Sequence, residues 1–157
     1  MWLPVGIDVV FAYFCDAANL DALTPPWLNF ETLTPKPIVM TAGTRIDHRL
    51  RVHHVPITWQ SEITVWNPPH QFVDEQRHGP YKLWKHRHDF VAENGGTWIR
   101  DHVESWPRGW ICAPLIDRWL VTPDLRTIFT YRHQKIRALL SPQSDAATDK
   151  IVIQAPG

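Results

Sequence analysis

The sequence predicts an α+β fold in which a curved antiparallel sheet wraps around one long C-terminal helix. Three observations predict it: two short helical patterns near the N-terminus, a period of two from Thr44 to Trp106, and an apolar helical stripe after Thr122. Helices and strands that are segregated along the chain are typical of α+β domains. A curved sheet around a long helix leaves a space between the two layers.

Two helices and a strand are predicted before the period-two region. Residues 7–16 have apolar side chains at helical spacing. A second, short helix is expected over residues 19–23, with Asn19 as its N-cap, and Pro25-Pro26 ends it. Residues 27–33 are predicted as a strand. Only Met1 to Pro4 precede the first helix, so a strand before it is either very short or begins upstream of the given start.

The period-two region predicts half-buried antiparallel strands with one wet face. Turns are expected at Pro68-Pro69, Gly79-Pro80 and Asn94-Gly95. A fifth strand over residues 71–77 is assigned Phe72, Asp74 and Gln76 as inward residues. The other inward positions are Ile46, His48, Leu50, Val52, Ile57, Trp59, Ser61, Ile63, Val65, Trp84, His86, His88, Phe90, Thr97, Ile99, Asp101 and Val103.

The long helix is expected to begin at Thr122, because a threonine cap followed by proline is a typical helix start. Residues 117–121 then form a separate turn or a kinked extension. One stripe of the helix carries Leu125, Ile128, Phe129, Arg132, Ile136, Leu139 and Leu140. Residues 1–140 are therefore predicted to form a single domain, and residues 141–157 a flexible tail.

Composition restricts the class of protein. The 157 residues suit one domain, and 16 basic and 16 acidic residues give a net charge of zero. That balance gives no indication of nucleic acid or an anionic membrane as partner. Two cysteines fit a reducing cytosol, no apolar run reaches the roughly 18 residues of a membrane span, and no secretory signal is evident. We expect a cytoplasmic protein without membrane insertion, and its oligomeric state stays open.

Several short strings, taken in this order and spacing, resemble one known superfamily. They are Val10-Phe11, Asn19-Leu20, Thr24-Pro25-Pro26-Trp27, Gly43-Thr44, Trp59, Pro68-Pro69, Gly79-Pro80-Tyr81, Trp84-x-His86-x-His88, Gly96-Thr97 and Asp101-x-Val103. With these strings the chain resembles START-like proteins (SRPBCC, helix-grip fold), and within them the bacterial ligand-binding branch and the polyketide cyclase/dehydrase-like proteins, over about Leu3 to Leu140. The resemblance implies a cavity for a small apolar or aromatic molecule, used in some members for cyclisation or hydrolysis.

Register arguments pair some of the inward polar residues. If Asn94-Gly95 forms a two-residue type I′ turn, His88 lies opposite Asp101 and Phe90 opposite Ile99. A four-residue loop over residues 53–56 would likewise set His48 opposite Ser61. A carboxylate partner fixes the tautomer of a histidine and raises its pKa, as a general base requires. The His88–Asp101 pair is therefore a candidate catalytic pair, although such pairs are also often structural.

The candidate ligand-binding residues line the same predicted face. Trp59, Trp84 and Phe90 would form an aromatic wall, while His86 and Gln76 would orient polar groups. Arg132 either reaches a ligand carboxylate or lays its stem along the core.

A metal site is the alternative to these assignments. His86 and His88 with Asp101 would make a two-histidine, one-carboxylate set. As the partner of His88, however, Asp101 would lie outside the ligand shell, and metals are not usual in the superfamily. We therefore predict no metal and no cofactor.

Three function classes remain open from the sequence. The first is binding of a small hydrophobic or aromatic ligand between the sheet and the long helix. The second is a cyclase, dehydratase or hydrolase that uses His88 and Asp101 as general acid and base. The third is an interaction module without a ligand.

Overall fold

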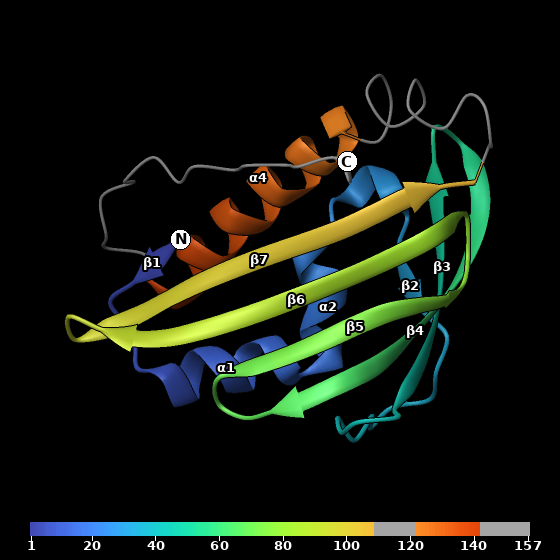
Figure 1. Cartoon of the computed structure of the whole chain (residues 1–157). Coiled ribbons are helices and arrows are strands. Elements are labelled where there is room, and N and C mark those ends of the chain that lie inside the picture. The colour runs from blue at the N-terminus through green and yellow to red at the C-terminus, as the bar shows by residue number, and fades with distance from the viewer. Residues whose placement is uncertain (109–121, 142–157) are drawn as a thin grey trace.

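The computed structural model describes residues 1–108 and 122–141 as a seven-stranded sheet with helices on one side (Figure 1). The strands are β1 (Trp2–Leu3), β2 (Glu31–Thr32), β3 (Arg45–Val52), β4 (Val55–Asn67), β5 (Gln71–His78), β6 (Tyr81–Glu93) and β7 (Gly96–Pro107). The helices are α1 (Ile7–Cys15), α2 (Ala17–Leu23), the short 3₁₀ helix η1 (Pro26–Leu28) and α4 (Thr122–Leu140). None of the helices in these two ranges has the length and apolar character needed to cross a membrane.

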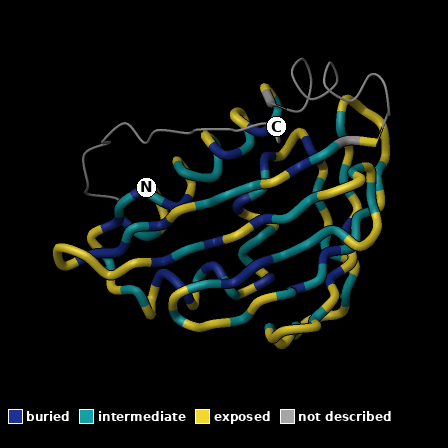
Figure 2. Tube along the Cα trace, viewed as in Figure 1, coloured by how far each residue is buried: buried dark blue, intermediate teal, exposed yellow. Residues whose placement is uncertain are grey.

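The sheet is antiparallel throughout, with the strand order β1-β7-β6-β5-β4-β3-β2. The predicted α+β helix-grip fold is confirmed. Both edge strands have only two residues, and β1 pairs with β7 through Trp2–Trp98 and Leu3–Thr97. Buried and exposed residues alternate along β6 and β7, as expected for strands with one wet face (Figure 2).

Two irregularities in the pairing of β4 with β5 interrupt the alternation. The register shifts between Gln60 and Ser61 and again between Ile63 and Val65. An extra residue in a strand turns the following side chains to the other face and bends the strand. Val65 is consequently 39% exposed, while Trp66 packs against the core. The prediction that Val65 faces inward was wrong for this reason.

The second helix begins earlier than predicted. α2 begins at Ala17, and the Asp16 side chain caps it by accepting a hydrogen bond from the Ala18 N–H at 2.8 Å. Asn19 is already inside the helix, where its side-chain amide donates to the Tyr13 carbonyl at 3.0 Å. Asn19 therefore ties α2 to the end of α1 and is not the N-cap.

The predicted strand over residues 27–33 is mostly absent. Pro26 occupies the first position of η1, and Asn29 ends this helix in the left-handed conformation with φ of 42°. Only Glu31 and Thr32 extend far enough to pair with β3. Proline geometry thus prevails over the strand propensity of Trp27 to Leu33.

α4 spans Thr122–Leu140, with Thr122 at the edge of the described range, and packs across the inner face of the sheet (Figure 1). Its Ile136 is fully buried and joins a core built from α1 and the central strands. Leu139 is 53% exposed, so the prediction that it belongs to the apolar stripe was wrong. The buried members of this core are Met1, Leu3, Val10, Phe11, Phe14, Leu23, Ile63, Phe72, Phe90, Ile99 and Ile136.

Candidate functional site

The β6–β7 hairpin has the register that the sequence predicts. Asn94 and Gly95 adopt φ values of 54° and 73°, as a two-residue type I′ turn requires. Glu93 therefore pairs with Gly96, and His88 lies opposite Asp101. Phe90 likewise lies opposite Ile99.

The β3–β4 hairpin differs from its prediction by two residues. His53 and His54 form a two-residue turn with φ values of 48° and 69°, in place of the four-residue loop. His48 therefore pairs with Trp59, and Ser61 pairs with Ile46. The predicted pairing of His48 with Ser61 was wrong because both turn histidines accept the left-handed backbone conformation.

A buried cluster of five titratable residues spans the inner face of the sheet; we call it the His–Asp cluster. It consists of Asp74 on β5, His86 and His88 on β6, Asp101 on β7 and His133 on α4. Asp101 Oδ1 lies 3.1 Å from Nε2 of His86 and 2.7 Å from Nδ1 of His88. The first contact is an aligned hydrogen bond, whereas the second is a close charge contact outside hydrogen-bond direction. Asp101 Oδ2 lies 3.9 Å from Nε2 of His133.

Asp74 contacts the same two histidines through their other ring nitrogens. Its Oδ2 lies 3.3 Å from Nε2 of His88 and 3.6 Å from Nδ1 of His86. The two imidazole rings lie with their centroids 3.8 Å apart, and Phe72 stacks on His88 at 4.1 Å. Both histidines are thus held between two carboxylates, with His88 only 2% exposed.

The environment separates the pKa values of the two histidines. Burial lowers the pKa of His86 and the neighbouring His88 lowers it further, against the smaller opposing effect of the two carboxylates. Burial also acts to lower the pKa of His88, but Asp101 and Asp74 outweigh it, so this pKa is raised. His88 is therefore the more basic member of the pair.

The carboxylates are held in the charged form. Burial alone would raise the pKa of Asp101, but its contacts with His133, His86 and His88 hold that pKa well below its usual range. Burial has the same tendency at Asp74, where the hydrogen bond with His88 and the charges of His86, His88 and Arg132 lower the pKa. The cluster therefore keeps two anions next to a histidine pair.

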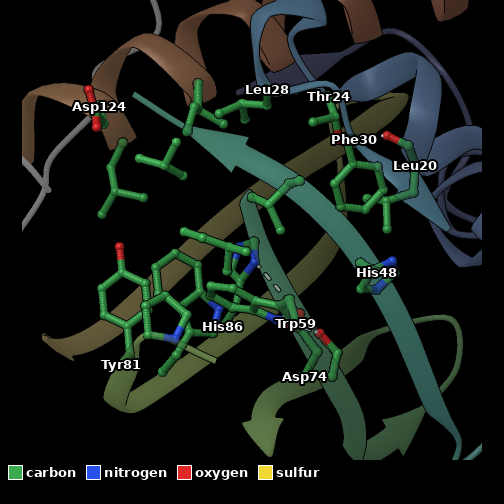
Figure 3. Close-up of a pocket in the computed structure, with 18 of the residues that line it drawn as sticks. Leu20, Thr24, Leu28, Phe30, His48, Trp59, Asp74, Tyr81, His86 and Asp124 are labelled. Carbon is green, nitrogen blue, oxygen red and sulfur yellow. Dashed lines mark hydrogen bonds and ion pairs between the residues drawn. The ribbon is translucent and has the colours of Figure 1, made fainter. Parts of the chain in front are cut away.

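A cavity of about 420 Å³ adjoins this cluster between the sheet and α4 (Figure 3). Its polar lining includes His48, Asp74, His86 and Arg132. In Figure 3, Asp74 and His86 lie close together beside Trp59, and Asp124 of α4 lies on the opposite side of the cavity. The apolar and aromatic lining consists of Leu20, Leu28, Phe30, Leu50, Val52, Ile57, Trp59, Tyr81, Trp84, Leu125, Ile128 and Phe129.

Two of the three predicted aromatic wall residues line this cavity. Trp59 and Trp84 meet edge to face with their ring centroids 5.1 Å apart, and Tyr81 lies 4.9 Å from Trp84. The Trp59 indole N–H donates to Ser61 Oγ at 3.0 Å, which satisfies its polar atom. Phe90 lies instead in the core beneath α1, 5.3 Å from Phe11 and 5.2 Å from Phe14.

Gln76 lies apart from the cavity lining. Its side-chain amide donates to the Tyr81 carbonyl at 2.8 Å and accepts from the Tyr81 N–H at 3.3 Å. Gly79 in the turn between β5 and β6 adopts a φ of 153°, which side chains rarely accept, so the turn favours glycine there. The structure therefore places Gln76 as a brace of that turn.

Arg132 lines the cavity and lies close to both the apolar core at Phe14 and the His–Asp cluster at Asp74. Its guanidinium carbon lies 5.3 Å from the centroid of the Phe14 ring, and its charge acts on Asp74. Its buried Nε has no hydrogen-bond partner among the described residues. The guanidinium therefore has a donor left for a ligand.

His48 is a cavity residue that the sequence marked as inward but did not select for the site. It is 4% exposed, its ring lies 4.8 Å from that of Phe30 at a tilt of 34°, and its Nδ1 has no hydrogen-bond partner within the described ranges. Burial lowers its pKa to about 4. His48 is consequently neutral at physiological pH.

The two cysteines and Trp27 either have structural surroundings or lie outside the described residues. Burial raises the pKa of the Cys15 thiol to about 12, so Cys15 is unreactive. Trp27 is 53% exposed and packs edge to face on Tyr131 of α4, which anchors its loop. Cys112 and the predicted turn at 117–121 lie outside the described residues.

Comparisons with known proteins support the fold. No family model and no curated protein matches the sequence. A START superfamily protein from Mycobacterium smegmatis matches with a TM-score of 0.64 at 9% identity, covering 92% of this chain and 95% of that chain. A major latex-like protein from Panax ginseng matches with a TM-score of 0.65 at 9% identity, covering 90% and 94%.

A protein from Chromobacterium violaceum matches with a TM-score of 0.69 at 12% identity, covering 91% of this chain and 94% of that chain. Identities this low show the fold alone. The START-like fold inferred from the sequence is thereby confirmed.

Proposed function

We propose that this chain binds a small apolar or aromatic molecule in the cavity between the sheet and α4. The observation that carries the proposal is the apolar and aromatic lining of a space of about 420 Å³, which also includes polar side chains such as His48, Asp74, His86 and Arg132. Sites for small molecules typically enclose about 300–1,000 Å³ and combine an apolar wall with few polar groups. The START-like fold adds support, because the resemblance implies a cavity at this place.

The polar groups indicate what the ligand carries besides its apolar body. A flat ring would lie against Trp59 and Trp84, which present aromatic surface to the cavity. The free Nε–H of Arg132 suits an acceptor such as a carbonyl or carboxylate oxygen. Neutral His48 can either donate or accept a hydrogen bond. We therefore propose an aromatic or polycyclic ligand with an oxygen-containing group.

The direct test is native mass spectrometry of protein purified from its own host, followed by a binding panel. Tryptophan fluorescence and melting temperature are measured with aromatic acids, polyketide-like molecules and fatty acids. Leu50→Trp, which fills the cavity, should abolish the response, whereas Val91→Trp on the exposed face should not. No response from the wild type to any compound would contradict the proposal and favour an interaction module.

A second candidate function is proton transfer on the bound ligand, as in a cyclase, dehydratase or hydrolase. The observation that favours it is that His86 and Asp74 line the cavity, while His88 and Asp101 lie directly behind them. His88 and Asp101 would then set the protonation of His86, which meets the ligand. His86→Gln should abolish turnover and leave ligand affinity within a few-fold; equal turnover in this variant would contradict the enzyme hypothesis.

The cytoplasmic location stays a prediction from composition. Cell fractionation with an antibody against the chain tests it. Recovery outside the cytoplasm would contradict it.

A further inference from the structure

When His86 and His88 are neutral, the His–Asp cluster contains more hydrogen-bond acceptor atoms than N–H protons to satisfy them. Each of the four ring nitrogens of His86 and His88 has a carboxylate oxygen within 3.6 Å. A neutral imidazole carries only one N–H and offers a lone pair at its other nitrogen. One nitrogen of each ring therefore faces a carboxylate without a proton between them.

The aligned contacts are His86 Nε2 with Asp101 Oδ1 and His88 Nε2 with Asp74 Oδ2, whereas Nδ1 of His88 has no aligned partner among the described residues. Nδ1 of His88 is 2.7 Å and Nε2 of His86 is 3.1 Å from Asp101 Oδ1. Nε2 of His88 and Nδ1 of His86 lie 3.3 Å and 3.6 Å from Asp74 Oδ2, and the first of these contacts is an aligned hydrogen bond. A single proton satisfies the hydrogen bond between His88 and Asp74, and a metal ion in its place would contact atoms of Asp74, His86 and His88 together.

We propose that Asp74, His86 and His88 bind a divalent transition-metal ion at the inner end of the cavity. The three ligand atoms all lie within 4.8 Å of one another. An ion about 2.0 Å from each of two ligand atoms in tetrahedral geometry holds those atoms about 3.3 Å apart. The separations of 3.3 Å and 3.6 Å between Asp74 Oδ2 and the two histidine nitrogens are close to that spacing.

Asp101 has the position of an outer-sphere carboxylate. Histidines that bind a metal usually donate their other ring N–H to a carboxylate, which fixes the tautomer and the ring orientation. One oxygen of Asp101 is hydrogen-bonded to Nε2 of His86 and lies 2.7 Å from Nδ1 of His88, outside hydrogen-bond direction, and its other oxygen faces His133 of α4 at 3.9 Å. Asp101 is therefore a positioning residue for the metal ligands.

The donor set and its surroundings indicate the class of ion. Two imidazole nitrogens and one carboxylate oxygen suit Zn²⁺, Fe²⁺, Co²⁺ or Ni²⁺ more than Mg²⁺ or Ca²⁺, which prefer oxygen ligands alone. Asp74 and His86 also line the cavity, so the remaining coordination positions face it. The ion would meet an oxygen-containing group of a molecule in the cavity, but its binding does not rest on such a molecule.

The test uses the full chain after dialysis against a chelator. Calorimetric titration with Zn²⁺ is expected to show one ion per chain. Titration with Co²⁺ should give intense visible d–d bands that differ from those of the hydrated ion. Asp74→Asn and His88→Gln should weaken Zn²⁺ binding more than Asp101→Asn, which should weaken it about 10- to 100-fold.

Two matched variants test whether metal binding belongs to this cluster and is independent of the cavity ligand. His102→Gln, which removes a partly exposed histidine beside Glu104, should leave affinity and stoichiometry unchanged. Leu50→Trp should keep the metal and lose the small molecule, so the two proposals fail independently. Circular dichroism shows whether each variant folds.

Two results would overturn the proposed metal site. Binding of less than one Zn²⁺ per folded wild-type chain would overturn it, as would unchanged affinity in Asp74→Asn. If Asp74→Asn and His88→Gln do not fold, the wild-type Co²⁺ spectrum decides, since a hydrated-ion spectrum would mean that the cluster holds only protons.

Discussion

The inner face of the sheet has a filled end and a hollow end, and β6 passes through both. Phe90 lies at the filled end, beneath Phe11 and Phe14 of α1. Trp84 lies at the hollow end and lines the cavity. His88 and His86 occupy the two inward positions between them, so the polar cluster marks the border between the two ends.

The difference between the two ends comes from the helices that cover them. At the filled end, α1 and Ile136 of α4 contribute large apolar side chains that meet the strands directly. At the hollow end, Leu125 and Phe129 from the start of α4 form a smaller buried group with Trp84. The inward residues of the same alternating strands thus form the core at one end and the cavity wall at the other, because different helix residues cover the two ends.

The largest expected contrast is between alanine substitutions at the two ends of β6. Phe90 is 1% exposed, so Phe90→Ala should lower the free energy of unfolding by about 3–5 kcal/mol. Trp84→Ala should cost less than about 3 kcal/mol, because one side of this indole already borders the cavity. Urea denaturation measures both. An equal or larger loss for Trp84→Ala would mean that the two ends are packed alike.

The pH dependence of stability tests the burial of His48 at the hollow end. Its pKa falls from 6.5 in the unfolded chain to about 4 in the fold because it is buried. Between these values the unfolded state binds more protons, so stability falls as the pH falls. The loss amounts to at most about 3 kcal/mol. Urea denaturation at pH 7 and pH 4 should show a smaller loss for His48→Phe than for the wild type.

The control for this titration is His102→Gln, on the outer side of the sheet. It should keep the wild-type dependence on pH. A His48→Phe variant with the same dependence as the wild type would show that another group is responsible.

Enlarging a side chain distinguishes a full core from a cavity. Ile99 is 1% exposed at the filled end, so Ile99→Phe should destabilise the fold by about 1–3 kcal/mol. Leu50→Phe adds its extra volume to the cavity and should change stability by less than about 1 kcal/mol. Thermal melts compare the two. A strongly destabilising Leu50→Phe would indicate that the cavity is too small for an added ring.

The sequence predicted the parts of this comparison that depend on local rules. The apolar stripe after Thr122 predicts α4, and Asn94-Gly95 sets the register that brings His88 opposite Asp101. The β3–β4 register failed because His53-His54 carries no glycine or asparagine to mark a two-residue turn. The bulge before Val65 likewise leaves no trace in the amino-acid pattern.

Only part of the candidate site could be predicted, because the sequence pattern is local whereas the site depends on contacts between distant elements. Alternation along a strand shows which residues face inward, but it does not show what covers them. Trp59, Trp84 and His86 therefore line the cavity, while Phe90 on the same face lies beneath α1. His48 was recognisable as inward, yet its role depends on Phe30, which contacts it only in the fold, and on the cavity that it lines together with residues of α4.

The smallest expected effect is at the rim of the hollow end, where the β3–β4 turn meets α4. His53 Nε2 lies 2.9 Å from Asp124 Oδ2, and both side chains are substantially exposed at 57% and 38%. Exposed ion pairs contribute about 0–1 kcal/mol and weaken with salt. Asp124 also lies in the first turn of α4, where a negative charge is favourable. Asp124→Ala should therefore cost more than His53→Ala, and a double-mutant cycle at low and high salt should give a coupling below about 1 kcal/mol that shrinks with salt. A coupling that exceeds this value and resists salt would mean that the rim is a fixed clamp between turn and helix, and the hollow end would then be as rigid as the filled one.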